Sequence, residues 1–118
     1  MNISRLFTLS IVFLLSSLVS AEVFISPSSR TVAQNGGGGG ILTTGNGNFT
    51  TTSSNSWITV VTSSGEAGDY VFYAVDGNNS ADDRVGYIDI VSSYNAQTFT
   101  ATHTVSQNGV AASLSPTS

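Results

Sequence analysis

The sequence predicts an all-β sandwich, and three observations lead to this prediction. Beyond residue 22 the apolar segments are short and rich in Val, Ile, Thr, Phe and Tyr, residues that favour strands. Gly, Asn and Ser interrupt these segments at short intervals, as turns do in sandwich domains. No segment has an apolar repeat of helical period over a useful length. We therefore expect several short strands that pack as two sheets.

The first 21 residues have the pattern of a secretory signal peptide. Arg5 supplies a positive charge, residues 6–19 form an apolar run, and Val19-Ser20-Ala21 provides small residues before Glu22. The run is shorter than the roughly 20 residues that a membrane-spanning helix needs. We expect cleavage after Ala21 and a secreted protein (periplasmic, extracellular or on the cell surface) that is free of the membrane after cleavage.

Composition narrows the partners that this chain can bind. The sequence contains no Cys and no Lys, and beyond the signal peptide two Arg stand against seven Asp and Glu. Without Cys no disulfide can form, so sheet packing must stabilise the fold. Binding to phosphates depends on Lys and Arg, and so we expect neither nucleic acid nor anionic membranes as partners. The absence of Lys also excludes P-loop and Schiff-base chemistry.

The N-terminal half of the domain predicts short strands separated by breaks. Its apolar and Thr-rich segments predict strands at residues 24–25, 31–34, 41–44, 49–52 and 57–62. Pro27 ends the first of these because proline cannot donate a hydrogen bond to a sheet. Residues 35–40 are almost entirely Gly and predict a turn, since they offer no side chains to pack.

Trp57 is the only Trp in the chain and stands at the start of a predicted strand. A lone Trp beside a strand usually buries much of its large surface, which favours a position at the rim of the core. The alternative is an exposed ring on which a sugar stacks.

The C-terminal half predicts three longer strands, which follow a turn at residues 63–68 and cover residues 70–75, 85–91 and 98–107. The first has apolar residues on both faces, so it is either covered on both sides or presents aromatic rings outward. In the second, Ile88 and Ile90 should face the core while Tyr87 points outward. The third alternates apolar residues with Thr, and it places His103 on the apolar face as a half-buried structural residue.

A polar loop at residues 76–84 contains three Asp, two Asn and one Arg. A sugar site needs an aromatic ring for the apolar face of the sugar, and amide, carboxylate or guanidinium groups for its hydroxyls. The candidate ligand-binding residues are Trp57, Tyr87, Asp76, Asn78, Asn79, Asp82 and Arg84, and Tyr70, Tyr73 and Tyr94 are further candidate rings. The alternative for Arg84 is that it braces the hairpin by pairing with Asp82, Asp83 or a loop carbonyl.

Metal, cofactor and catalytic sites are not expected. Oxygen ligands recur at every second residue of the loop, at Asp76, Asn78, Ser80 and Asp82. A calcium loop would need Gly where Ala81 stands and Glu where Tyr87 stands. His103 is the only His and there is no Cys, so a transition-metal ligand set is lacking. No Gly-x-Ser-x-Gly motif is present beside this single His, so we do not expect an enzyme.

Two segments of the chain are echoed near its end. Residues 32–36 (VAQNG) resemble residues 105–109 (VSQNG), and residues 25–29 (ISPSS) resemble residues 114–118 (LSPTS). The second pair is about one domain length apart, as in tandem arrays. We therefore expect one domain at residues 22–109 and a tail at 110–118 that resembles the start of a further repeat. Such a tail can replace the first strand of a neighbouring molecule and cause self-association, unless the echo reflects a truncated reading frame.

Segments between Phe24 and Gly109 resemble the BACON domain, a Bacteroidetes-associated and often N-terminal module for which carbohydrate binding is proposed. The matching pieces are Ile25-Ser26-Pro27, Phe49 and Trp57 in NFTTTSSNSWITV, Asn79-Ser80 through Arg84-Val85-Gly86-Tyr87-Ile88-Asp89-Ile90, and His103-Thr104-Val105-Ser106-Gln107-Asn108-Gly109. Phe49 departs from the family pattern, which often has a second Trp there.

The resemblance implies an immunoglobulin-like β-sandwich of about seven strands. It also implies a secreted, non-catalytic accessory domain that binds glycan, either carbohydrate or mucin. A structural spacer or a self-associating surface subunit without a small-molecule ligand is the alternative.

Overall fold

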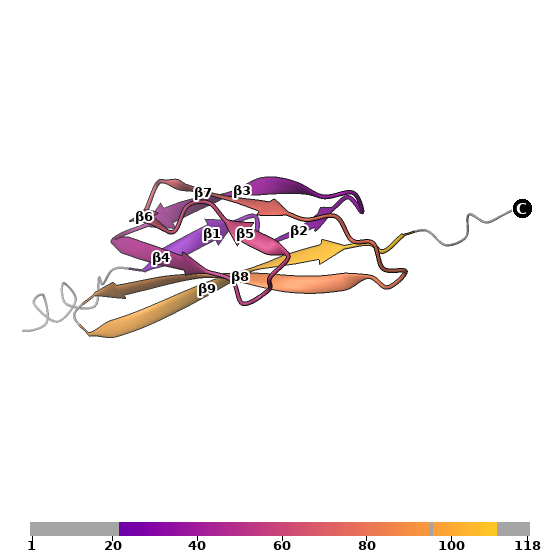
Figure 1. Ribbon diagram of the computed structural model, residues 1–118. Helices are drawn as coiled ribbons and strands as arrows, with labels where there is room; N and C mark the ends of the chain where they lie inside the picture. The colour runs from indigo at the N-terminus through magenta and orange to yellow at the C-terminus, as the bar shows by residue number, and fades with distance from the viewer. Residues whose placement is uncertain (1–21, 95, 111–118) are drawn as a thin grey trace, which may run out of the picture.

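The computed structural model describes residues 22–94 and 96–110, which form two β-sheets packed face to face (Figure 1). The predicted signal peptide at 1–21 and most of the predicted tail lie outside the described residues. The described ranges contain no helix and nine strands: β1 (Val23–Ser26), β2 (Ser29–Val32), β3 (Gly37–Gly45), β4 (Asn48–Thr52), β5 (Ile58–Val60), β6 (Ser64–Glu66), β7 (Tyr70–Val75), β8 (Arg84–Tyr94) and β9 (Gln97–Gln107). The predicted all-β, immunoglobulin-like sandwich is confirmed.

One sheet has the strand order β1-β3-β7-β5 and the other has the order β2-β9-β8-β4-β6. The chain passes from the first sheet to the second at Pro27, where the sequence predicted a break, so β1 and β2 are edge strands of different sheets. Neighbouring strands are antiparallel except β2 and β9, which run parallel. The long β8–β9 hairpin forms the middle of its sheet.

The core lies between the sheets and follows the alternation of side chains along each strand. Its buried apolar residues are Val23, Val32, Ile41, Phe49, Ile58, Val71, Tyr73, Val75, Ile88, Ile90 and Val105. Along β8, Ile88 and Ile90 face inward and the exposed Tyr87 faces outward, as predicted. The sequence pattern did not decide which face of β7 points inward. The structure buries Val71, Tyr73 and Val75, and it turns the aromatic residues Tyr70 and Phe72 outward.

The glycine-rich segment is a strand rather than the predicted turn. Residues 37–40 begin β3 and pair with β7, with Gly39 opposite Tyr73 and Gly40 opposite Phe72. A Cβ atom on Gly39 would lie 2.7 Å from the Tyr73 hydroxyl oxygen. The missing side chains therefore make room for the ring of Tyr73, a reason for glycine that depends on the partner strand.

Two further predictions were wrong in detail. The predicted turn at 63–68 contains β6, which pairs with β4 through Asn48 and Glu66. His103, expected to be half-buried, is fully buried. In the described part of the chain no helix is long and apolar enough to cross a membrane.

Candidate functional site

Trp57 and Arg84 meet at one end of the sandwich. Trp57 immediately precedes β5 and Arg84 begins β8, and the guanidinium carbon lies 4.2 Å from the centroid of the indole ring. The partly buried ring packs against the core and covers Gly86, where an added Cβ would lie 2.7 Å from it. This geometry is a cation–π contact, and it covers the ring face that points toward Arg84.

The same guanidinium joins β8 to the polar loop. Arg84 donates from Nη2 to the backbone carbonyls of Asp76 (3.1 Å) and Gly77 (3.2 Å), and from Nε to the side-chain oxygen of Gln107 (2.8 Å). The backbone N–H of Asp76 donates to the carbonyl of Trp57 at 3.0 Å. The structure therefore brings Trp57, Asp76 and Arg84 together, and Arg84 braces the loop through carbonyls, one of the alternatives that the sequence left open.

Asn78 holds the loop from inside. Its side chain is buried, donates from Nδ2 to the carbonyls of Asp82 (2.8 Å) and Asn108 (3.3 Å), and accepts from the N–H of Ser80 (3.1 Å). Asn79 and Asp82 are exposed on the loop that Asn78 shapes. Because the Asn78 amide is engaged within the protein, its role in the site is to position the loop.

Tyr87 lies on the other face of β8. Trp57 covers Gly86 on the inward face, whereas the side chain of Tyr87 is exposed on the outward face. Backbone contacts hold this residue, since its N–H donates to Asn55 Oδ1 (2.9 Å) and its carbonyl accepts from Ser53 Oγ (2.8 Å). The structure does not bring the rings of Tyr87 and Trp57 into one site.

Gln107 is a central residue of the site that the sequence did not single out. Its buried side-chain nitrogen donates to the carbonyls of Ala33 (3.0 Å), Gln34 (3.3 Å) and Asp76 (2.8 Å), and its oxygen accepts from Arg84. One amide thus ties the end of β9 to the loop after β2 and to the polar loop. Its place in the repeated V-x-Q-N-G segment was the available signal.

His103 and Tyr73 form a buried polar contact between the two sheets. His103 Nδ1 lies 2.8 Å from the Pro27 carbonyl, which can only accept, so Nδ1 carries the proton. Nε2 then accepts from the Tyr73 hydroxyl at 3.0 Å. Burial lowers the pKa of His103 and raises the pKa of Tyr73, since both charged forms would be desolvated.

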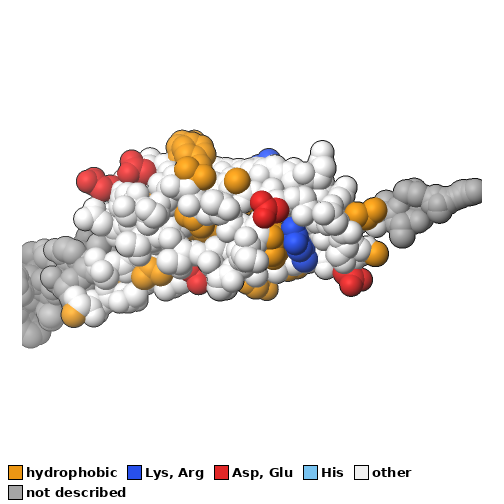
Figure 2. All heavy atoms as spheres, viewed as in Figure 1, with side chains coloured by type: hydrophobic (Ala, Val, Ile, Leu, Met, Phe, Trp, Pro, Cys, Tyr) orange, Lys and Arg blue, Asp and Glu red, His pale blue; other side chains and the backbone are white. Residues whose placement is uncertain are grey.

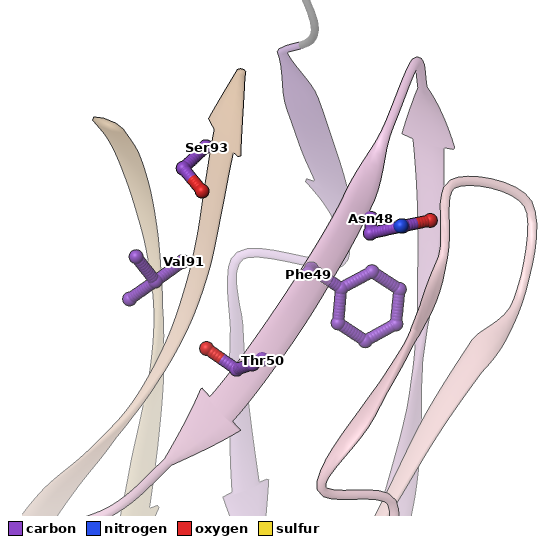
Figure 3. Close-up of a pocket in the computed structure, with 5 residues that line it drawn as sticks. All are labelled: Asn48, Phe49, Thr50, Val91 and Ser93. Carbon is purple, nitrogen blue, oxygen red and sulfur yellow. The ribbon is translucent and has the colours of Figure 1, made fainter. Parts of the chain in front are cut away.

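A shallow hollow lies elsewhere, between β4 and β8, with a volume of about 220 Å³. Its lining residues are Asn48, Phe49, Thr50, Val91 and Ser93 (Figure 3). The Phe49 ring and the Thr50 side chain leave β4 on opposite sides, and Phe49 is buried in the core. The lining contains no ionisable group, and among the described residues no group of three or more Asp, Glu, His or Cys could hold a metal ion.

Comparison with known proteins identifies the family. The family model described as "BACON: Putative binding domain, N-terminal" matches residues 47–108. The chain belongs to the BACON family. The match spans β4 to β9 and includes Trp57, the polar loop and Gln107. It confirms the resemblance seen in the sequence, and no curated protein matches the chain.

Solved structures share the fold of this BACON domain. A Bacteroides ovatus GH5 xyloglucanase in complex with a XXXG heptasaccharide matches 75% of the chain with a TM-score of 0.64 and 19% identity. The periplasmic chaperone SfaE matches 80% with a TM-score of 0.60 and 9% identity, and the CsuC-CsuE chaperone–tip adhesion subunit complex from Acinetobacter baumannii matches 80% with a TM-score of 0.58 and 12% identity. The BACON chain spans 19% of the xyloglucanase chain and 61% of each matched chain in the other two.

Proposed function

We propose that this BACON domain is a secreted, non-catalytic accessory domain that binds glycan, either carbohydrate or mucin. The observation that carries the proposal is the convergence of Trp57, Asp76 and Arg84 at one end of the sandwich. An aromatic ring, a guanidinium and an exposed loop with carboxylates are the groups that sugar recognition requires. The family description as a binding domain agrees with this chemistry.

In the proposed site the fold uses backbone groups to hold the loop and leaves exposed side chains for the ligand. Asp76 contributes its N–H and carbonyl to the fold, while its carboxylate is on an exposed residue. Asn79 and Asp82 are also exposed, and together with Arg84 they would bond sugar hydroxyls. Arg84 lies over Trp57, so a sugar would contact the guanidinium and the rim of the indole rather than the covered ring face.

A non-catalytic role fits the position of the one His in the chain. Both ring nitrogens of His103 are engaged inside the protein, with Pro27 and Tyr73, and so it is not placed to activate a nucleophile on the surface.

Affinity electrophoresis in gels that contain mucin or plant polysaccharides tests the proposal. We expect at least one glycan to retard the protein, and we expect Asp76→Asn to reduce the retardation because only a side-chain carboxylate changes. Glu66→Gln, an equivalent change on exposed β6, is the matched control. If none of these glycans retards the unmodified protein, the proposed function is wrong.

Self-association is a second candidate function, and it is favoured by the position of the first strands. β1 and β2 are edge strands, so a matching segment from another molecule can replace them without passing between other strands. The tail at 110–118 is the proposed donor, because its residues 114–118 (LSPTS) resemble residues 25–29 (ISPSS). Sedimentation of the chain with and without residues 110–118 tests this, and a monomer in both cases at high concentration argues against it.

A further inference from the structure

The outward face of β7 presents two aromatic rings that the core does not use. Tyr70 and Phe72 are each 52% exposed, their ring centroids are 5.9 Å apart, and their ring planes differ by 18°. Figure 2 shows hydrophobic side chains that protrude from the surface over β3 and β7. The two rings are stacked on each other, and their exposed parts form an apolar patch that a sugar can contact.

Few side chains project from β3 next to the two rings, because β3 has glycine at these positions. Gly40 lies opposite Phe72, and an added Cβ would be 3.2 Å from the Phe72 ring and 3.7 Å from the Tyr70 ring. The next outward pair is Gly38 and Ala74, which have little or no side chain. The missing side chain of Gly40 therefore makes room for the Phe72 ring itself, and the small residues Gly38 and Ala74 lie next to the rings along the same face.

This sheet face carries no charged side chain along its paired strands. The outward residues in register are Phe24, Ser26, Leu42, Thr44, Thr59, Tyr70, Phe72 and Ala74. Of the two Arg of the described ranges, Arg84 lies at the end of the sandwich, and Arg30 is on β2 of the other sheet, from which its side chain reaches the inward side of β3 at Gly39. None of the outward side chains in register is a cation, so a neutral ligand matches this face best.

The uncharged face leads directly to the site at Trp57 and Arg84. The outward alternation of β7 runs from Tyr70 through Phe72 and Ala74 to the exposed Asp76, which is bonded through its backbone to Trp57 and Arg84. At about 3.3 Å per residue this track is about 20 Å long. Such a length fits several sugar units rather than one terminal sugar.

We propose that an extended, neutral polysaccharide chain binds along the outward face of β7. Tyr70 and Phe72 stack on sugar units in the middle of the chain, and Asp76 and Arg84 bond the hydroxyls of a unit at one end. This inference rests on the proposed glycan-binding function and deepens it, since it names the ligand class and adds two residues outside the polar loop.

The test combines gel retardation with binding calorimetry. The intact protein is run in gels that contain neutral galactomannan, neutral hydroxyethylcellulose or anionic polygalacturonate, and oligosaccharides of increasing length from the retarding polymer are then titrated. The variants are Tyr70→Ala and Phe72→Ala, and Tyr87→Ala is the matched control because Tyr87 is similarly exposed (49%) on the other sheet. Urea unfolding of each variant verifies that it is folded.

We expect retardation by a neutral polymer but not by polygalacturonate, and affinity that rises with oligosaccharide length. Each ring deletion should weaken binding about tenfold or more, as for an aromatic residue at the centre of an interface, while Tyr87→Ala binds like the unmodified protein. Binding that is unchanged in Tyr70→Ala and Phe72→Ala overturns the inference but leaves glycan binding in place. Dimers that Phe72→Ala dissociates, without any loss of glycan binding, would assign this face to a second copy of the chain.

Discussion

Removal of one buried hydroxyl tests whether the contact between Tyr73 and His103 stabilises the sandwich. Tyr73→Phe keeps the ring in the core and deletes the donor that lies 3.0 Å from His103 Nε2. His103 is fully buried, so its nitrogen is left without that partner and away from water. An unsatisfied buried acceptor costs about 1–3 kcal/mol. In a domain of this size we expect the melting temperature to fall by about 4–8 °C for each kcal/mol.

The assay is urea unfolding at pH 7.5, followed by Trp57 fluorescence. Tyr70→Phe is the matched control: it deletes the same hydroxyl from the same strand, but from an exposed side chain on the outward face. Such a surface change should alter the free energy of unfolding by less than about 0.5 kcal/mol. If Tyr73→Phe is no more destabilising than Tyr70→Phe, the contact between the sheets contributes nothing and the reasoning is wrong.

Three further predictions concern stability. Burial lowers the pKa of His103, so below about pH 6.5 the unfolded state binds the proton more readily than the folded state, and the free energy of unfolding falls as the pH drops. Above that pH the contribution of His103 to the free energy of unfolding is constant. Urea midpoints at pH 7.5 and 5 measure this, and a slope that persists in His103→Gln would belong to other groups. Gly86→Ala should lower the free energy of unfolding by about 1–3 kcal/mol, because the new Cβ would lie within 2.8 Å of three side chains. At Gly77 the nearest atom is 3.4 Å from an added Cβ, so Gly77→Ala should have almost no effect, and thermal unfolding measures both variants. Gln107→Ala should lower the free energy of unfolding by about 2–4 kcal/mol, because it removes a buried amide that binds three carbonyls. Gln97 is exposed, so Gln97→Ala should have little effect on the free energy of unfolding, and equal denaturant midpoints for the two variants would contradict this reasoning.

The fold could be predicted from the sequence wherever one strand carries its own pattern. Ile88 and Ile90 alternate with exposed residues, and the structure buries both. Gly39 carries no side-chain pattern, and its strand conformation depends on Tyr73, 34 residues away in the sequence, so a turn was predicted instead. β6 has the sequence Ser-Gly-Glu and is a strand because β4 pairs with it, which no property of those three residues indicates.

The candidate site shows the same limit. Residue types identified Trp57 and Arg84, but their contact depends on where β5 and β8 begin and on how the loop is folded. Gln107 could not be identified from the sequence, because a single amide side chain has no distinctive spacing. Its importance comes from three carbonyls, of Ala33, Gln34 and Asp76, that the fold brings to it. The outward position of Phe72 followed only from the register of β7 with β3.

The parallel pairing of β2 with β9 has a mechanical consequence. These strands lie close to the two ends of the described chain, which are at opposite ends of the sandwich (Figure 1). Tension between the ends therefore pulls β2 and β9 past each other along their length, so that the ladder from Ser29 and Thr104 to Val32 and Gln107 is loaded in shear. Bonds loaded in this way must break together, whereas a hairpin pulled from its open end loses them one at a time. We therefore expect the β2–β9 ladder to resist pulling along the long axis of the sandwich better than a hairpin of the same length that is pulled from its open end.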